Sequence, residues 1–382
     1  MKNLPVKLQH KLDYREENNA LRQLPSNNTS VDFSSNDYLG FSKSAAIFEN
    51  TYEFLKGHNI TQNGATGSRL LSGNHPLFNV LESTLSNFHN CDAALIFNSG
   101  YDANVGFFSS VPQRGNIILY DEYIHASIRD GITMSNAKAY KFKHNNLEDL
   151  EKRCEIEHNR SHSETTIYIV TESVFSMDGD IPDLLSITQI SKKYDALLVI
   201  DEAHATGVFG NKGEGLVQYH GLEEAIFARI VTFGKAIGCH GAAILGSSSL
   251  RDFLINFSRS FIYTTALPPH SLAAIHSAYN ELITTPNRQR LIENIKYFRD
   301  QVFKIKLNDQ FIPSDSAIQS CIINGNDHVK DVANKLQENN FDVKPILSPT
   351  VPEGQERLRF CLHSYNTEKE IREVLQLLTT FV

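Results

Sequence analysis

The sequence has little of what marks secreted, membrane-spanning or nucleic-acid-binding proteins. Its five cysteines are scattered and include no C-x-x-C pair, which argues against a disulfide framework and against a zinc site. No apolar run approaches the ~20 residues that a membrane-spanning helix needs. Acidic residues outnumber basic ones by 44 to 36, so no excess of positive charge favours nucleic acid or an anionic membrane. We expect neither as a partner, and we expect a reduced, cytoplasmic environment.

The N-terminal residues also lack the pattern of a targeting segment. Residues 1–30 include Asp13, Glu16 and Glu17 and have no continuous apolar core, which argues against a signal or transit peptide. Leucines recur at roughly helical spacing over residues 4–24. We expect residues 1–45 to form an N-terminal arm that lies across another surface.

The composition is that of an ordinary globular protein. Hydrophobic residues make up 41% of the chain and charged residues 21%. A length of 382 residues is large for one hydrophobic core and suggests two or three domains. After the arm, we expect a large α/β domain over residues 46–270. The pattern of apolar and polar residues changes after Pro268-Pro269, and we expect a smaller α+β domain over residues 271–382.

Six short apolar runs alternate with segments of helical length and periodicity. Continuous apolar runs of this kind indicate strands buried on both faces, as in a mostly parallel sheet covered by helices. Ligands bind such sheets at the carboxyl ends of the strands, so the residues that follow each run are the candidate site residues. The runs are residues 93–97, 117–120, 166–170, 197–200, 230–233 and 242–245.

Three of these strand ends carry polar or small residues suited to ligand binding. The turn Ser99-Gly100-Tyr101 offers free backbone N–H groups for a phosphate and an aromatic ring, although an ordinary turn would look similar. His125 follows the second run and could stack on a flat ring or carry a proton, whereas a lone histidine is more often structural. Ser176 lies in the loop after the third run and offers a hydroxyl group.

The fourth strand ends in Asp201, followed by His204. An aspartate that ends a buried strand is costly unless a cation meets it, and a protonated pyridine ring is such a cation. The letters Asp-Glu-Ala-His also match a helicase motif, but that function needs a Walker glycine loop, which this chain lacks. A metal site at Asp201 and His204 lacks a third convincing ligand, so we expect no metal.

A single lysine follows the fifth run. Lys235 lies between Gly234 and Gly238, where an apolar strand gives way to a flexible turn, and the hydroxyl of Thr232 precedes it. Apolar surroundings lower the pKa of an amine, and glycine lets a ligand approach the backbone closely. Chains that hold pyridoxal 5'-phosphate (PLP) as a Schiff base need such a lysine. A lysine in a glycine turn is more often a solvated loop residue, so the other strand ends must support this interpretation.

Nine stretches spread over nearly the whole chain carry a family resemblance. They are residues 33–40 (FSSNDYLG), 67–73 (GSRLLSG), 99–101 (SGY), 125–127 (HAS), 176–180 (SMDGD), 201–207 (DEAHATG), 232–235 (TFGK), 263–269 (YTTALPP) and 357–359 (RLR). Together they resemble the α-oxoamine synthases, fold-type I PLP enzymes that join an amino acid to an acyl thioester with loss of carbon dioxide. The resemblance implies an α/β fold with a mostly parallel, seven-stranded-type sheet flanked by helices.

The resemblance also implies roles for the strand-end residues. Lys235 would carry the cofactor, Asp201 would pair with its ring nitrogen, His204 and Ser176 would contact its phenolic oxygen, and His125 would stack on the ring. Lys235, Asp201, His204 and His125 would be the catalytic residues.

Further residues would hold the phosphate and ring of the cofactor. Gly100 and Tyr101, in the turn that begins at Ser99, would serve this purpose together with Thr232. Thr264 or Thr265 would reach the phosphate in the neighbouring subunit, because the family site lies at a homodimer interface.

Substrate would be contacted by residues from several parts of the chain. The resemblance assigns this role to Arg22, Asn36 and Arg359. On a strand, Arg359 shares a face with Arg357 and Cys361, and its guanidinium could hold a carboxylate by two hydrogen bonds, whereas Arg357 is interpreted as a surface salt bridge. Ser68 is smaller than the threonine of the glycine-using aminolevulinate synthases, which leaves room for the methyl group of alanine.

The motifs favour those members of the family that condense L-alanine with a pimeloyl thioester in biotin biosynthesis. The acyl carrier, coenzyme A or a carrier protein, stays open. Glycine C-acetyltransferase, which uses glycine and acetyl-CoA, is the nearest alternative. An alternative of another class is a PLP-binding regulatory protein without activity.

Overall fold

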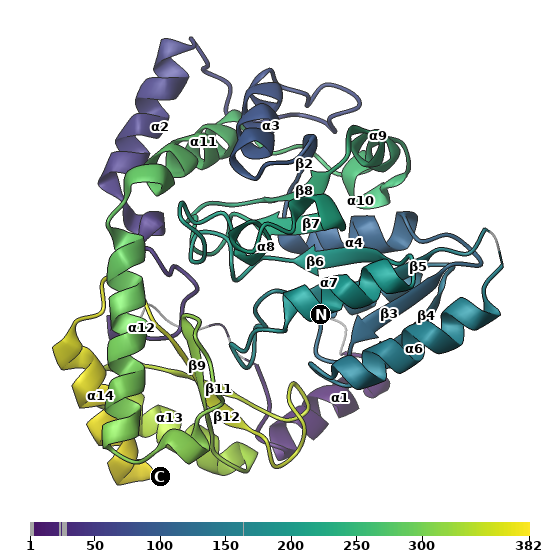
Figure 1. Cartoon of the computed structure of the whole chain (residues 1–382). Coiled ribbons are helices and arrows are strands. Elements are labelled where there is room, and N and C mark those ends of the chain that lie inside the picture. Colours follow the sequence, from purple (N-terminus) through teal and green to yellow (C-terminus); the bar gives the residue numbers. More distant parts are fainter. Residues whose placement is uncertain (1–3, 23, 25–28, 163) are drawn as a thin grey trace. The chain divides into compact units, whose positions relative to one another are not determined.

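The computed structural model describes residues 4–22, 24, 29–162 and 164–382, which form two compact units (Figure 1). The larger unit comprises residues 36–176 and 180–290, and the smaller one comprises residues up to 35, residues 177–179 and residues 291–382. The domain boundaries expected after residues 45 and 270 stay predictions, because a compact unit need not fold independently. No helix of the described chain is long and apolar enough to cross a membrane.

The larger unit is built on a seven-stranded sheet, in agreement with the prediction. Its strand order is β2-β8-β7-β6-β5-β3-β4, and all neighbours are parallel except at β8, which runs antiparallel to β2 and to β7. The strands are β2 (Ala93–Phe97), β3 (Ile117–Asp121), β4 (Lys138–Phe142), β5 (Ile167–Glu172), β6 (Leu197–Asp201), β7 (Ile226–Thr232) and β8 (Ala242–Gly246).

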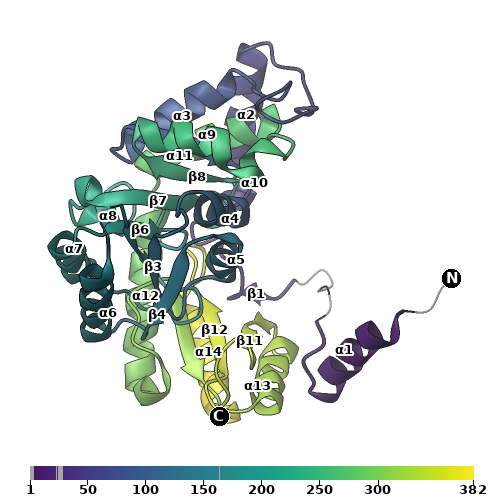
Figure 2. The same cartoon turned by 90° about the vertical axis from the view of Figure 1, so that its right-hand side faces the viewer.

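Helices cover both faces of this sheet (Figure 2). One face packs against α4, α5 and α9 through an apolar cluster that includes Phe107 and Leu254. The other face packs against α6, α7 and α8 through a second cluster that includes Leu150 and Ile187. The helices of the unit are α2 (Ala45–Gly57), α3 (Leu77–Phe88), α4 (Gly100–Ser110), α5 (Ala126–Met134), α6 (Leu147–Arg160), α7 (Leu184–Lys193), α8 (Leu216–Tyr219), α9 (Ser248–Phe257), α10 (Arg259–Ile262) and α11 (Pro269–Thr284).

Two strands differ from the sequence prediction: β4 was not predicted, and β8 is antiparallel to its neighbours. Strand β4 (Lys-Ala-Tyr-Lys-Phe) was not among the six runs, because it is an edge strand with exposed lysines that discourage pairing with another chain. The antiparallel direction of β8 follows from its short connection to β7, since a parallel pair needs a longer crossover.

The smaller unit packs helices against a three-stranded antiparallel sheet of order β11-β12-β9. Phe360 of β12 lies in the core of this unit, where its ring contacts those of Phe33, Phe298 and Phe311. The elements are α1 (Val6–Glu17), β1 (Val31–Asp32), α12 (Asn287–Lys304, whose first turn belongs to the larger unit), β9 (Ile318–Ile322), α13 (Asn326–Glu338), β10 (Phe341–Asp342), β11 (Lys344–Ile346), β12 (Arg357–Cys361) and α14 (Glu368–Phe381).

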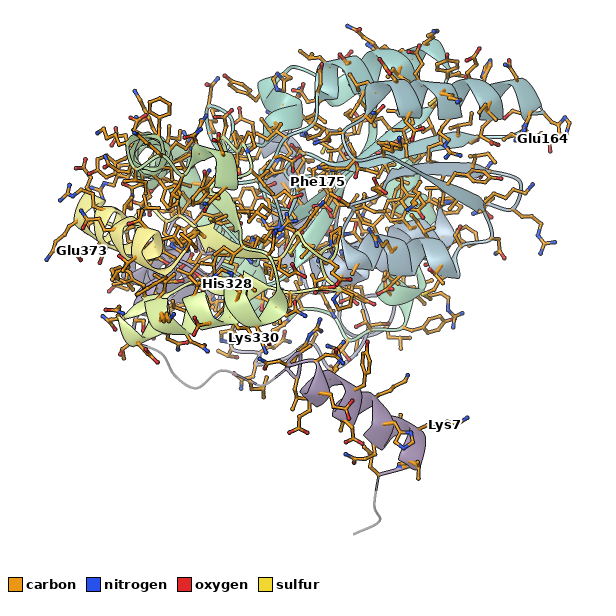
Figure 3. The ribbon with its side chains drawn as sticks, turned by 90° about the horizontal axis from the view of Figure 1, so that it is seen from below. Lys7, Glu164, Phe175, His328, Lys330 and Glu373 are labelled. Atoms are coloured by element: carbon orange, nitrogen blue, oxygen red, sulfur yellow. The ribbon has the colours of Figure 1, made fainter. Side chains whose placement is uncertain are left out.

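The N-terminal helix α1 is attached to α13 by polar contacts near its end. Lys330 Nζ donates to Asn19 Oδ1 at 2.8 Å, and Asn19 Nδ2 donates to Asp327 Oδ1 at 3.0 Å; Lys330 is labelled on α13 in Figure 3. The leucines of α1 stay exposed in the single chain, which agrees with the expectation that this arm covers another surface.

Arg357 corrects one expectation, because its ion pair is buried rather than on the surface. It contacts the carboxylate of Asp178, and the two side chains are 2% and 9% exposed. Within the same unit, Arg299 forms an ion pair with Asp315 whose side chains are 50% and 69% exposed. The two pairs allow a matched comparison of burial.

We predict that Arg357→Met lowers the free energy of unfolding by about 3–5 kcal/mol, because it leaves a buried carboxylate without its cation. Arg299→Met is the control and should cost no more than about 1 kcal/mol, since water screens an exposed pair. Urea unfolding followed by circular dichroism measures both. Equal losses in the two variants would contradict the prediction.

Candidate active site

Lys235 lies in the tight turn that joins β7 to β8. Within this turn, Gly238 N donates to Lys235 O at 2.8 Å, and Cys239 N donates to Phe233 O at 2.7 Å. Gly238 has a φ of 65°, and a Cβ atom there would lie 2.3 Å from the backbone nitrogen of Ser42. The turn therefore requires glycine at this position, and it holds a half-buried lysine at the end of a buried strand.

The amine of Lys235 is held by a chain of hydrogen bonds. Lys235 Nζ lies 2.6 Å from His204 Nε2, and His204 Nδ1 lies 2.7 Å from the hydroxyl of Tyr38. The Tyr38 hydroxyl donates in turn to Asn36 Oδ1 at 3.1 Å. The structure thus brings together three residues that the sequence predicted separately, and it adds the buried Tyr38, which sequence reasoning missed.

Asp201 ends the central strand β6 as a buried carboxylate. It accepts hydrogen bonds from Asn104 Nδ2 at 2.8 Å and from Ala203 N at 2.9 Å. Both donors are neutral, whereas a buried carboxylate is best stabilised by a cation. Asp201 therefore fits the protonated nitrogen of a pyridine ring.

A second carboxylate, Glu172, ends the neighbouring strand β5 directly opposite Asp201. It is fully buried, and its Oε1 accepts from His125 N at 2.6 Å. Burial and the charge of Asp201 raise the pKa of Glu172 well above its usual range, against a smaller lowering by Lys235. Sequence reasoning missed Glu172, although its position at the end of a buried strand is the same signal that identified Asp201.

His125 precedes α5 and caps its first turn. Its Nδ1 lies 2.7 Å from Ser127 Oγ, and Ser127 N donates to the same nitrogen at 3.2 Å. Burial lowers the pKa of His125; the charge of Asp201 raises it and that of Lys235 lowers it, and the net shift is downward. The imidazole is therefore neutral near pH 7, as suits a ring that lies against another ring.

The helix start at Gly100 has the features of a phosphate site. Ser99 Oγ accepts from Asp102 N at 3.1 Å and so fixes the first turn of α4. A Cβ atom on Gly100 would lie 3.6 Å from Thr232 Oγ1, so the Thr232 hydroxyl lies next to the start of the helix. Free N–H groups at a helix N-terminus and a hydroxyl group are suitable partners for an anion.

Four more residues were predicted to contact the cofactor, and three of them lie beside this turn or within it. Asn98 Nδ2 donates to Thr264 Oγ1 at 2.9 Å and to Thr265 O at 2.6 Å, which places both threonines beside the turn of their own chain. Tyr101 is half-exposed and donates its hydroxyl to Asp130 Oδ2 at 2.7 Å. Ser176 is buried in the loop after β5.

The predicted substrate residues are distributed over both units. Asn36 and Ser68 belong to the larger unit, where Ser68 O accepts from Gly73 N at 2.9 Å in the turn over residues 67–73. Arg22 is exposed, and Arg359 is buried on β12, where its Nη1 donates to Cys361 Sγ at 2.9 Å. Arg359 and Cys361 therefore share a strand face as predicted, and their contact with substrate stays a prediction.

A partly buried imidazolium, His144, connects the loop of His125 to the loop of Ser176. His144 Nδ1 lies 2.9 Å from Asp121 Oδ1, and its Nε2 lies 2.8 Å from Asp180 Oδ2. Because carboxylates only accept hydrogen bonds, both ring nitrogens must carry protons. Burial alone would lower the pKa of His144, but the hydrogen bonds to Asp121 and Asp180 raise it to about 9.

We predict that His144 makes stability depend on pH in alkaline solution. Its folded pKa lies above the usual value of about 6.5 for histidine, so its stabilisation is complete below about pH 6.5 and is lost as the pH rises through 9. Solvent screening reduces the effect to on the order of 1–2 kcal/mol. The difference in unfolding free energy between the wild type and His144→Gln should therefore shrink between pH 6 and pH 10, and a constant difference would refute the assignment.

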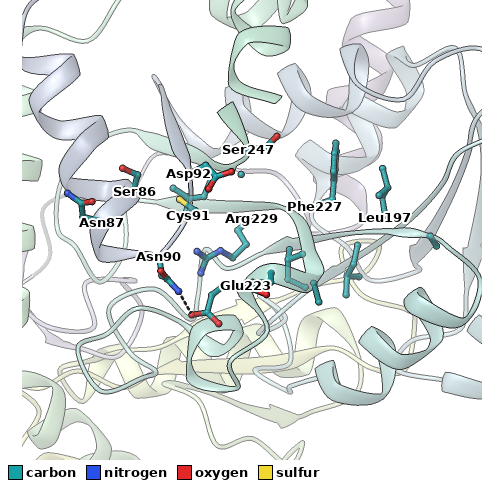
Figure 4. A pocket seen from close by; sticks show the side chains of 17 residues that line it. Ser86, Asn87, Asn90, Cys91, Asp92, Leu197, Glu223, Phe227, Arg229 and Ser247 are labelled. Atoms are coloured by element: carbon teal, nitrogen blue, oxygen red, sulfur yellow. Dashed lines mark hydrogen bonds between the residues drawn. The ribbon is translucent and has the colours of Figure 1, made fainter. Parts of the chain in front are cut away.

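A cleft lies elsewhere, at the opposite end of the strands (Figure 4). It has a volume of about 710 Å³ and is lined by Leu197 and Ile226, which begin β6 and β7, and by Arg229. The buried Arg229 Nη1 lies 3.7 Å from Glu202 Oε2. Because ligands of such sheets bind at the carboxyl ends, this cleft is separate from the residues around Lys235.

Comparison with known proteins identifies the family. Residues 28–378 match the family model described as aminotransferase class I and II. The chain belongs to this family. It is 40% identical over 374 residues to 8-amino-7-oxononanoate synthase of Emericella nidulans, and the match covers 94% of this chain and 90% of that protein.

Solved structures agree with this assignment. The structure of 8-amino-7-oxononanoate synthase from Francisella tularensis matches with a TM-score of 0.77 at 30% identity, covering 92% of this chain and 97% of that one. A serine palmitoyltransferase variant from S. paucimobilis, with PLP and myriocin bound, matches with a TM-score of 0.88 at 25% identity, covering 98% and 96%. The fold-type I prediction and the resemblance to α-oxoamine synthases are thereby confirmed.

Proposed function

We propose that this protein condenses L-alanine with a pimeloyl thioester to give 8-amino-7-oxononanoate, the free thiol carrier and carbon dioxide, a step of biotin biosynthesis. The observation that carries the proposal is the 40% identity to a synthase of that name over 94% of the chain. The arrangement of Lys235, His204 and Asp201 at the strand ends supplies the chemistry that such a reaction needs.

The residues at the strand ends fit PLP as the cofactor. When bound, PLP supplies an aldehyde that captures amines and a protonated ring that withdraws electrons. Lys235 would hold the aldehyde, Asp201 would pair with the ring nitrogen, and the start of α4 at Gly100 with Thr232 would hold the phosphate. The neutral donors around Asp201 and the Thr232 hydroxyl next to Gly100 support this fit.

The protein residues then control protons and orientation. The Lys235 amine would be the group that removes the α proton of alanine. His204 lies against that amine at 2.6 Å and fixes its position through Tyr38. His125 and Ser176 would orient the cofactor ring. Arg359, with Arg22 and Asn36, would hold substrate carboxylates, and Ser68 would leave room for the alanine methyl group.

The proposal includes a cytoplasmic homodimer with a shared site. The five cysteines are free thiols, which suits a reducing compartment. The exposed leucines of α1 and the apolar loop residues Leu70 and Leu71 provide surface for a second copy. In that dimer, Thr264 or Thr265 would reach the phosphate in the partner site.

A substrate matrix on the purified, PLP-loaded protein tests the function. L-alanine, glycine and L-serine are each combined with pimeloyl-CoA, pimeloyl carrier protein, acetyl-CoA and palmitoyl-CoA, and thiol release and products are measured. We expect turnover to be fastest with alanine and a pimeloyl donor. Preference for glycine and acetyl-CoA would indicate a C-acetyltransferase. Absence of thioester turnover in a protein that binds PLP would indicate a regulatory protein.

The serine and palmitoyl-CoA arm is included because of the structural match. The serine palmitoyltransferase superposes with a TM-score of 0.88, against 0.77 for the Francisella synthase. The sequence identity is 25% in the first case and 40% for the Emericella synthase. Backbone similarity is common to the whole fold, whereas side-chain identity follows the substrate, so the matrix should favour alanine.

A further inference from the structure

Asn104 of α4 is a buried residue that contacts both Asp201 and Ser127, the second of which contacts His125. It is 2% exposed. One proton of its amide group goes to Asp201 Oδ2 at 2.8 Å, and the other goes to Ser127 Oγ at 3.0 Å. A single amide nitrogen therefore connects the end of β6 with the first turn of α5.

The second contact continues to His125. Ser127 Oγ accepts from Asn104, so its own proton is available for His125 Nδ1, which lies 2.7 Å away. Ser127 N also donates to this nitrogen, at 3.2 Å. Since Nδ1 accepts both bonds, the proton of the neutral imidazole must lie on Nε2. The chain of contacts that begins at Asp201 thus determines the tautomer of His125.

The arrangement leaves the other atom of the amide unpaired. Among the described residues, no donor lies within hydrogen-bonding range of Asn104 Oδ1, although this atom is buried. A buried polar atom without a partner costs about 1–3 kcal/mol. The amide nitrogen of Asn104 is thus fully used, by Asp201 and Ser127, whereas its oxygen is not.

We infer that Asn104 is a positioning residue, which fixes Asp201 and the Nε2–H form of His125 for the cofactor ring. The inference rests on the proposed function, because it concerns the residues expected to hold PLP. It applies the principle that local violations of folding rules concentrate at functional sites. The lowered pKa of the buried His125 agrees with a neutral ring.

Asn104→Leu is the main variant, and Asn116→Leu is its matched control. Asn116 is also buried in the larger unit, at 7% exposure, but its Oδ1 accepts from Gln113 N at 2.7 Å. The same substitution therefore removes two hydrogen bonds to residues of the site at one position, and one hydrogen bond to a backbone N–H of a loop at the other. We expect both variants to lower the unfolding temperature, because each leaves a buried polar group without its partner.

The effects on the site should distinguish the two variants. In the PLP-loaded enzyme, Asn104→Leu should lower kcat by roughly 10- to 100-fold, because the ring partners are displaced, and it should change the visible circular dichroism of the bound cofactor. In the cofactor-free protein, the ¹⁵N shifts of His125 should move from the Nε2–H form toward a tautomer mixture. Asn116→Leu should leave kcat, dichroism and tautomer as in the wild type.

Ser127→Ala provides a second, smaller change. It keeps the contact between Asn104 and Asp201 and removes only the connection to His125, so the tautomer should change while Asp201 stays in place. Wild-type tautomer and kcat in both Asn104→Leu and Ser127→Ala would overturn the inference. So would a loss of stability in Asn104→Leu equal to that in Asn116→Leu with an unchanged site. Failure of the wild type to bind PLP would refute the proposed function instead, and the cofactor-free histidine spectra would still decide the role of Asn104.

Discussion

Lys235→Ala should abolish turnover, with a loss of kcat of at least about 10⁴-fold, since it removes both the covalent holder of the cofactor and the base next to the substrate. The lysine lies in a turn fixed by Gly238 and against His204, and no other amine can take its position without rebuilding that turn. Activity with alanine and pimeloyl-CoA measures the loss. Borohydride reduction of the PLP-loaded wild type, followed by peptide mapping, should place the label on residue 235.

Lys212→Ala is the matched control. Lys212 belongs to the same unit but lies on an exposed loop, where its backbone N donates to Glu214 Oε2 at 2.6 Å. We expect this variant to retain wild-type activity and labelling. If the label appeared on a lysine other than Lys235, or if Lys235→Ala kept normal activity, the proposed site would be wrong.

The strand ends were predictable from the sequence because buried parallel strands have a strong local signal. The run that ends in Asp201 is apolar up to that residue, and the run before Lys235 is mostly apolar, so the polar residues that follow them stand out. The rule that ligands gather at carboxyl ends then brings these residues together. The structure brings two of these residues together, since Lys235 Nζ lies 2.6 Å from His204 Nε2.

The parts that were missed depend on contacts between distant positions. Tyr38 reaches His204 across 166 positions of sequence, and Asn104 reaches Asp201 across 97. Neither residue follows an apolar run, so nothing local indicates its function. Arg357 was assigned to the surface for the same reason, because its buried partner Asp178 lies in a different part of the chain.

Glu172 and Asp201 make the carboxyl end of the sheet selective for a cation. They are paired neighbours on β5 and β6, and the charge of Asp201 raises the pKa of Glu172. The raised pKa favours the protonated form of Glu172, whose Oε1 accepts the backbone N–H of His125. A cationic ring nitrogen would then pair with Asp201.

Asp201→Asn should lower kcat on the order of 10³-fold while the protein still binds PLP. An amide cannot keep a ring nitrogen protonated, so proton removal from alanine loses its electron sink. Asparagine has nearly the same shape and can still accept from Asn104, so the fold should persist. Because the charge of Asp201 raises the pKa of His125, that pKa should fall further in the variant, and NMR titration of the cofactor-free protein measures it.

Asp195→Asn, at the other end of strand β6, is the control that removes the same charge at a different position. Asp195 lies exposed in the turn that precedes this strand, with a φ of 50°, a conformation that asparagine also adopts readily. Asp195→Asn should therefore leave kcat and the pKa of His125 unchanged. Near-normal kcat in Asp201→Asn would mean that the buried carboxylate has a structural role in the sheet and none in catalysis. A parallel loss in both variants would trace the effect to net charge instead of to the carboxyl end of the strand.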